Sequence, residues 1–219
     1  AAPQPTAAPT PPPLDIPFLT AWQGSAHADA KAEAFNHWNT ADPVAVPKDC
    51  ARCHSTTGYQ DFLGADGSAA GTVEADQPIG QVLTCVACHN TATVALTSVK
   101  FPSGLEVTGL GPEARCMQCH QGRASGATVD AAIKRANLTD PDTVSKDLGF
   151  TNIHYLAAGA MLYGSEAAGG YQYADQIYDQ KFRHVPGKDS CLGCHNQHTL
   201  QVKVDECTVC HKDVKTKDD

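Results

Sequence analysis

Three stretches of the chain combine alanine and other apolar residues with polar ones in a way that favours short helices. They are residues 26–38 (AHADAKAEAFNHW), 128–138 (TVDAAIKRANL) and 152–164 (NIHYLAAGAMLYG), and Ser25 is a suitable N-cap for the first. Long segments separate the three, with turn-forming sequences such as DGSAAG at 66–71. No segment is apolar enough and long enough to predict a transmembrane helix. The pattern therefore predicts short helices joined by extensive loops.

The N-terminal end has a composition of its own. Seven of the first 17 residues are proline and four are alanine, which favours an extended polyproline conformation. A disordered spacer is the alternative. We expect residues 1–21 to form a proline-rich arm and residues 22–219 to form a single domain. An ordered arm of this kind is suited to gripping a neighbouring copy of the chain.

Cysteine follows a stricter pattern than the apolar residues. The motif C-x-x-C-H occurs five times and uses all ten cysteines. In this motif the two thiols add to the vinyl groups of haem and the histidine binds the iron, so five covalent haems c are predicted. The cysteines are Cys50, Cys53, Cys85, Cys88, Cys116, Cys119, Cys191, Cys194, Cys207 and Cys210, and the motif histidines are His54, His89, His120, His195 and His211.

Zinc and disulfides are the other chemistries that use paired cysteines. A zinc site takes two ligands from each C-x-x-C pair, but nothing in zinc chemistry requires a histidine directly after every second cysteine. A disulfide framework would use varied spacings, whereas this chain repeats a single one. Haem c is therefore the favoured interpretation.

The remaining histidines equal the motifs in number. They are His27, His37, His154, His184 and His198, and the only methionines are Met117 and Met161. Haem iron takes two axial ligands, and methionine would raise its potential. Since Met117 lies inside the third motif, we expect it not to reach a distal face. The simplest assignment is two histidines at every iron, with low potentials and no open coordination position; for each histidine alone, the alternative is a surface or hydrogen-bonded role.

Two spacings bear on how these histidines are used. His198 stands three residues after His195 in CHNQH, on a neighbouring face of a helical turn, so we expect it to bind a different haem lying alongside. His27 and His37 are ten residues apart. On the predicted helix they would lie about 15 Å apart along the axis, so we expect them to serve two different irons.

Composition supports a fold built around cofactors. The 219 residues leave about 44 for each predicted haem, and hydrophobic and aromatic contents are 42% and 6%, which is little for an ordinary core. Porphyrins would supply the missing core. We therefore predict a mainly α fold with extensive irregular loops, in which short helices wrap around a stacked haem array and strand is scarce.

Charge and the first residues indicate a location. The formal net charge is −8 before haem propionates are added, so nucleic acid is not an expected partner. The chain begins AAPQPTAAPTPPPLDIP without an initiator methionine or a signal peptide, as a mature exported protein would. Bacteria and archaea attach haem c outside the cytoplasmic membrane, and no cysteine is spare for a lipid. We expect a secreted, periplasmic or extracellular protein without a lipid anchor.

The chain resembles the multihaem c-type cytochromes of respiratory electron export. The resemblance rests on the five motifs, WQGSAHADA near the N-terminus, CHNQH and the matching supply of distal histidines, and it spans residues 22–211. It implies closely stacked bis-histidine haems that pass electrons between redox proteins. Some relatives polymerise into extracellular filaments, in which an N-terminal histidine binds a haem of the adjacent subunit. That role would fall on His27 or His37.

An enzyme is the main alternative to an electron carrier. The pentahaem nitrite reductases keep one haem open and attach it through C-x-x-C-K, a motif that does not occur in this sequence. An open haem would also leave one histidine without a role. We therefore predict electron transfer rather than catalysis of the nitrite or hydroxylamine type, and haem or metal storage has little support. The choice between a soluble shuttle and a filament stays open.

Overall fold

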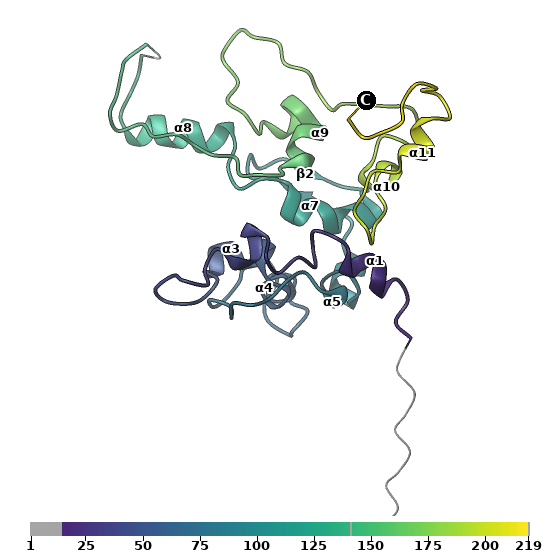
Figure 1. Cartoon of the computed structure of the whole chain (residues 1–219). Helices are drawn as coiled ribbons and strands as arrows, with labels where there is room; N and C mark the ends of the chain where they lie inside the picture. The colour runs from purple at the N-terminus through teal and green to yellow at the C-terminus, as the bar shows by residue number, and fades with distance from the viewer. Residues whose placement is uncertain (1–14, 141, 219) are drawn as a thin grey trace, which may run out of the picture.

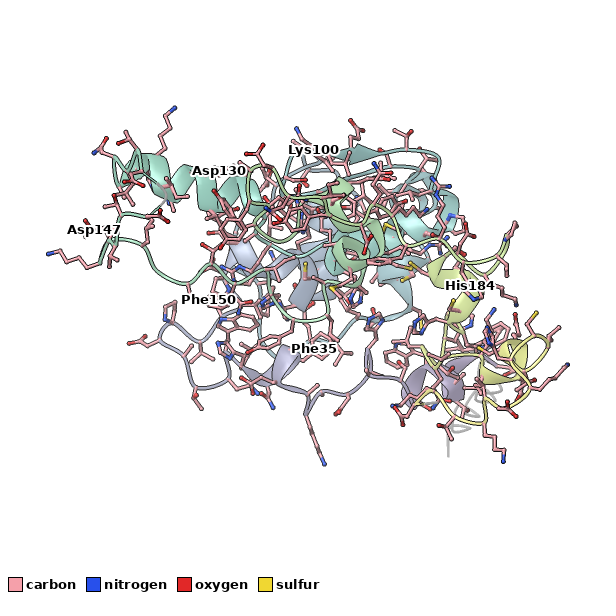
Figure 2. All side chains as sticks on the ribbon, turned by 90° about the horizontal axis from the view of Figure 1, so that it is seen from above. Phe35, Lys100, Asp130, Asp147, Phe150 and His184 are labelled. Atoms are coloured by element: carbon pink, nitrogen blue, oxygen red, sulfur yellow. The ribbon has the colours of Figure 1, made fainter. Side chains whose placement is uncertain are left out.

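A computed structural model describes residues 15–140 and 142–218, so most of the predicted proline-rich arm lies outside the described residues. Helices from the first part of the chain, α1, α3, α4 and α5, form one layer, and α7, α8 and α9 form a second layer over it (Figure 1). Helices α10 and α11, from the C-terminal segment, lie at one side of the molecule. Viewed from above, Asp130 and Asp147 mark one end and His184 lies toward the other (Figure 2).

Most of the elements are short. The first half of the chain forms α1 (Leu19–Gln23), α2 (Glu33–Asn36), α3 (Lys48–His54), α4 (Thr56–Phe62), α5 (Cys85–Cys88) and α6 (Thr91–Ala95). The hairpin β1 (Val99–Lys100) and β2 (Glu106–Val107) follows, then η1 (Gly111–Glu113), α7 (Ala114–His120), α8 (Gly126–Arg135) and α9 (Ala158–Ala167), and finally α10 (Cys191–Cys194) and α11 (Val204–Cys207). The predicted mainly α fold with extensive loops and little strand is confirmed.

A small apolar core joins α7, α9 and the hairpin. Strands β1 and β2 pair antiparallel with Val99 opposite Val107, and this hairpin packs on the two helices. The buried members of the core are Val99, Phe101, Ala114, Met117, Ala157, Ala160, Tyr163 and Ala167. Half of them are alanine, so the core contributes little buried area for a chain of this length.

Many large apolar side chains lie at the surface. Phe150 is 93% exposed, Tyr155 81% and Leu156 78%, and the latter two follow His154 directly. Exposed aromatic and aliphatic groups beside candidate iron ligands are the groups that porphyrin faces would cover.

Two of the three predicted helices form. Helix α8 confirms the prediction for 128–138; it starts two residues earlier, where the Ser125 amide donates to Thr128 Oγ1 at 3.1 Å. Helix α9 covers the second half of 152–164 but begins only at Ala158. His154 precedes it with φ +89°, which is incompatible with a right-handed helix.

The predicted helix over 26–38 is wrong. Only Glu33–Asn36 is helical, and turns occupy the residues before it. The Asp29 carboxylate accepts the Lys31 amide at 2.9 Å, a local bond that competes with helix formation. The carbonyl of His27 accepts the Leu83 amide at 3.1 Å. Tertiary contacts therefore override the helix propensity of alanine.

Candidate haem-binding site

Each C-x-x-C-H motif forms one helical turn. Motif one closes α3, motif three closes α7, motifs two and four coincide with α5 and α10, and motif five begins at the last residue of α11 and continues as a turn. In motifs two, four and five the histidine amide donates to the carbonyl of the first cysteine, at 2.8, 2.8 and 2.9 Å. Positions i, i+3 and i+4 share one face of a helix. Both thiols and the imidazole of each motif are thus presented on the same side.

Two motif histidines face a distal histidine with nearly parallel rings. The ring centres of His27 and His120 are 6.2 Å apart with planes at 20°, and those of His89 and His198 are 6.2 Å apart at 3°. Rings in van der Waals contact would be about 3.5–4 Å apart. With metal–nitrogen bonds of about 2 Å on each side, two imidazoles that share a metal have centres about 6 Å apart. The observed spacings fit an iron between the rings.

Two further pairs have the same spacing at steeper angles. The ring centres of His54 and His154 are 5.8 Å apart with planes at 78°, and those of His184 and His211 are 6.1 Å apart at 34°. Four of the five motif histidines therefore have a distal histidine at a distance that suits a shared haem iron. The residues present fit the cofactor that the motifs predict.

Backbone carbonyls orient several motif imidazoles. The Nδ1 atom of His54 bonds the carbonyl of Ala34 at 2.7 Å, that of His120 the carbonyl of Leu156 at 2.8 Å, and that of His195 the carbonyl of Leu200 at 2.8 Å. A carbonyl can only accept, so Nδ1 carries the proton and Nε2 keeps its lone pair. This is the tautomer that binds a metal through Nε2.

Burial keeps several of these imidazoles neutral. Desolvation, followed by the nearby His120, lowers the pKa of His27 from 6.5 to about 4. Desolvation also lowers the pKa of His54 and that of His154. A neutral imidazole is the form that binds a metal, so at neutral pH these side chains are ready as ligands.

His195 and His37 are left over from the pairing. Within residues 15–140 and 142–218, no histidine ring stands opposite His195. The His37 ring meets Trp38 edge-on, with centres 4.8 Å apart, and its Nδ1 bonds Glu33 at 2.7 Å. The His37 side chain is 58% exposed. One motif thus lacks a distal histidine within the described chain, and one exposed histidine lacks a motif.

The methionines occupy different environments. Met117 is 1% exposed and belongs to the apolar core, in agreement with the expectation that it does not serve a distal face. Met161 is 69% exposed on α9.

The attachment cysteines of different motifs lie side by side. All ten cysteines fall within the described residues, and none of them forms a disulfide there. A hydrogen bond with Cys53, together with burial, raises the pKa of the Cys119 thiol, and the neighbouring Cys191 does the same for Cys116. The two cysteines of motif three therefore face two different motifs, one and four.

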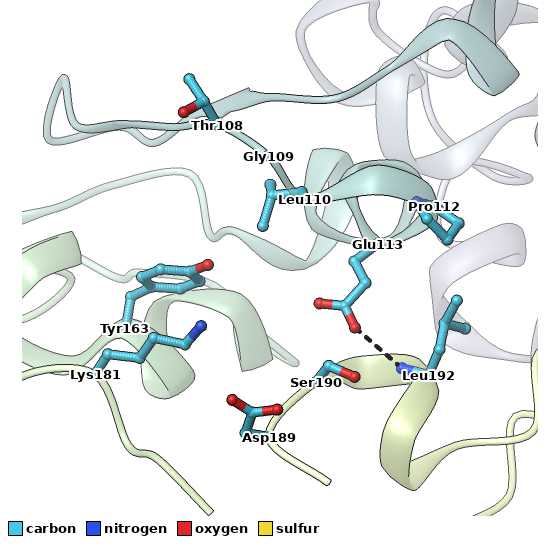
Figure 3. A pocket seen from close by; sticks show the side chains of 10 residues that line it. All are labelled: Thr108, Gly109, Leu110, Pro112, Glu113, Tyr163, Lys181, Asp189, Ser190 and Leu192. Carbon is cyan, nitrogen blue, oxygen red and sulfur yellow. Dashed lines mark hydrogen bonds between the residues drawn. The ribbon is translucent and has the colours of Figure 1, made fainter. Parts of the chain in front are cut away.

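A pocket of about 450 Å³ lies where motif four meets the second layer. Figure 3 shows the Glu113 carboxylate, at the end of η1, directed at the Leu192 amide, which donates to it at 3.4 Å. On the opposite wall the Lys181 ammonium lies 4.7 Å from the centre of the Tyr163 ring, a cation–π contact. The Glu113–Leu192 bond holds the motif-four turn near the start of α7, the helix that carries motif three.

Comparison with known proteins agrees with this chemistry. Residues 33–121 match the family described as cytochrome c7 and related cytochrome c. The chain is 33% identical over 215 residues to the C-type polyheme cytochrome OmcC of Geobacter sulfurreducens, covering 76% of this chain and 26% of that protein. It is 30% identical over 221 residues to OmcB of the same species, covering 78% of this chain and 28% of that one. No solved structure matches.

The chain is a multihaem c-type cytochrome. It spans about a quarter of the length of the curated relatives that it matches.

Several residues that shape the site escaped the sequence analysis. The carbonyls of Ala34, Leu156 and Leu200 carry no signal in the sequence, because any residue has one. Tyr59, buried between three motifs, is indistinguishable in the sequence from an ordinary core tyrosine. Phe18 stacks on His198, with ring centres 4.3 Å apart and planes at 6°. Its place in the proline-rich end of the chain gave no indication of this.

Proposed function

We propose that this chain binds five haems c covalently and transfers electrons along them. The observation that carries the proposal is the set of four histidine pairs with ring centres 5.8–6.2 Å apart. Each motif would hold one haem through its two cysteines and its histidine. Haem c supplies a one-electron redox centre. His154, His198, His27 and His184 would be the distal ligands for motifs one, two, three and five.

The protein residues fix the conditions of transfer. Hydrogen bonds from Nδ1 to carbonyls hold three of the motif imidazoles, those of His54, His120 and His195, in one tautomer and one orientation. Two histidines would hold the iron at each of the four paired sites, which would favour low potentials and leave no place for a substrate there. Partners would then be other redox proteins, and the reaction an electron exchange at the protein surface.

In this proposal, the iron at motif four, bound by His195, would take its second ligand from another copy of the chain. His195 is oriented by Leu200 but has no histidine opposite it in the part of the chain that the structure describes. His37 is exposed, and its ring bonds Glu33 and meets Trp38 edge-on. His37 of one copy binding the His195 haem of the next is a heterologous contact, which repeats into an open filament unless its rotation closes a ring. We place this assembly outside the cytoplasmic membrane, in the periplasm or beyond the cell. In the described part of the chain, no helix has the length and apolar character to cross a bilayer.

A second candidate function rests on the same leftover site. If the His195 iron stays without a distal histidine, it can bind and reduce a small ligand, as nitrite or hydroxylamine reductases do. The lack of a histidine ring opposite His195 among the described residues favours this alternative. The enzyme alternative leaves the unpaired His37 without a role, and this favours the assembly.

Two measurements test the proposal. The intact mass of the denatured protein should equal the polypeptide plus five haems; fewer haems, or none, would refute the count. The variant His37→Ala should keep all haems but fail to assemble and show one high-spin iron per chain at every concentration. Wild type should assemble as concentration rises and lose its high-spin signal. Nitrite turnover by a high-spin iron that persists in the wild type regardless of concentration would support the enzyme instead.

A further inference from the structure

Helix α4 follows motif one directly and lies flat against it. The Ser55 hydroxyl donates to the carbonyl of Ala51, inside motif one, at 3.0 Å and accepts the Gly58 amide at 3.0 Å, which caps α4. A Cβ added at Gly58 would lie 2.5 Å from the Ala51 oxygen. Only glycine allows the two backbones to approach this closely. The position of α4 is therefore set by the motif-one turn.

The same helix holds the residues that lead into motif two. The Thr56 hydroxyl donates to the carbonyl of Val82 at 2.6 Å and accepts the amide of Thr84 at 2.9 Å. Thr84 directly precedes Cys85. Thr57 adds bonds to the side chain of Gln81, including one of 2.9 Å. Motif two is thus fastened to α4 at its entry.

One turn further along, Tyr59 reaches motif three. It is 3% exposed, and its hydroxyl donates to the carbonyl of Arg115, next to Cys116, at 3.3 Å. Burial raises the pKa of Tyr59 far above its usual range, so the phenol is neutral. Attachment thiols of all three motifs lie near enough to raise this pKa further; they are Cys119, Cys88, Cys116 and Cys53.

We infer that Thr56 and Tyr59 are positioning residues that set the distances and angles between the haem attachment turns of motifs one, two and three. The inference rests on the proposed function, because it concerns haems held at these turns. Each cysteine pair ties a macrocycle to its turn, so a rigid spacer between turns is a rigid spacer between macrocycles. The rate of electron transfer between two centres falls steeply as the distance between them grows. Residues that fix this distance therefore also set the rate.

The ring of Tyr59 contributes more than its hydroxyl. An O–H···O bond in proteins is about 2.5–3.0 Å long, and the bond to Arg115 is longer, at 3.3 Å. A buried aromatic ring fills the space between three turns whether or not it carries a hydroxyl. Phenylalanine at position 59 should therefore preserve the spacing of the three turns, whereas a shorter aliphatic side chain should not.

The experiment measures the excitonic circular dichroism of the haem Soret band, which depends on the angles and distances between neighbouring haems. Tyr59→Phe should keep the wild-type couplet, while Tyr59→Leu should reduce its amplitude and shift the reduction midpoints. Tyr173→Leu, at a tyrosine that is 67% exposed, is the matched control and should change neither. Intact mass reports haem loading for every variant, so a wrong haem count is recognised separately.

If Tyr59→Leu binds fewer haems than the wild type, a second variant still tests the inference. Thr56→Val keeps the shape of the side chain but removes all hydroxyl bonds toward motif two, and it should also alter the couplet. A fully loaded Tyr59→Leu or Thr56→Val protein with the wild-type couplet and midpoints would overturn the inference. An altered couplet in Tyr173→Leu would overturn it as well, because the effect would then not be specific to α4.

Discussion

The imidazole of His198 lies opposite that of His89, with ring centres 6.2 Å apart and planes at 3°, although His198 follows His195 by only three residues. One short segment thus carries the motif histidine of one haem site and faces the motif histidine of another. In the proposed array, CHNQH would couple motifs two and four directly.

Removing His198 should expose one iron. In His198→Ala we expect one additional high-spin iron per chain and carbon monoxide binding to the reduced protein at that site, because the distal ligand is lost. Gln197→Ala, at the exposed neighbouring position, should leave the spectrum unchanged. An unchanged low-spin spectrum in His198→Ala would show that another group serves the His89 iron.

Phe18 should stabilise the His198 imidazole in its position opposite His89. Its ring is stacked on His198 with centres 4.3 Å apart, and aromatic pairs contribute about 0.5–1.5 kcal/mol. Phe18→Ala should therefore speed carbon monoxide binding at the His89 site by up to roughly tenfold. Ile16→Ala, another exposed apolar residue in the same segment, is the control. Equal carbon monoxide binding rates in the two variants would show that Phe18 does not stabilise His198.

Gly58→Ala should destabilise the protein. Its new Cβ would lie 2.5 Å from the Ala51 oxygen, and overpacking of this kind costs about 1–3 kcal/mol. Gly149→Ala places a methyl group where no atom lies within 4 Å, so it should change stability by less than about 0.5 kcal/mol. Chemical denaturation followed by circular dichroism measures both. Equal midpoints would contradict the close packing of α3 and α4.

The two methionines should respond differently to truncation. Met117→Ala removes a side chain that is 1% exposed and should cost about 2–5 kcal/mol. Met161→Ala alters a side chain that is 69% exposed and should cost less than about 0.5 kcal/mol. The haem absorption spectrum of each variant should match that of the wild type. A spectral change in Met161→Ala would reveal a methionine ligand and would contradict the assignment of histidine ligands to every iron.

The sequence predicts the haem-binding chemistry better than it predicts how the chain folds. The C-x-x-C-H spacing is local, since three side chains on one helical turn need no tertiary information. His198 lies opposite a motif histidine other than His195, and its partner His89 carries no signal in the local sequence. That pairing depends on how segments more than a hundred residues apart in the sequence come together.

The wrong helix prediction has an identifiable cause. Residues 26–38 have the composition of a helix, yet the Leu83 amide donates to the His27 carbonyl and the Lys31 amide donates to the Asp29 carboxylate, and these bonds hold the segment in turns. His27 is consequently brought to His120 while His37 remains at the surface. Five spare histidines for five motifs suggest one distal histidine for each iron, with His27 or His37 available to a neighbouring copy. The structure instead leaves His37 and His195 apart.

The most direct test of the account is the number of high-spin irons in the dissociated, oxidised monomer, measured by electron paramagnetic resonance against the total haem content. Four histidine pairs and one unpaired motif histidine predict four low-spin irons and one high-spin iron per chain, the latter bound by His195. Five low-spin irons in the monomer, or more than one high-spin iron, would contradict the pairing on which the proposed function rests.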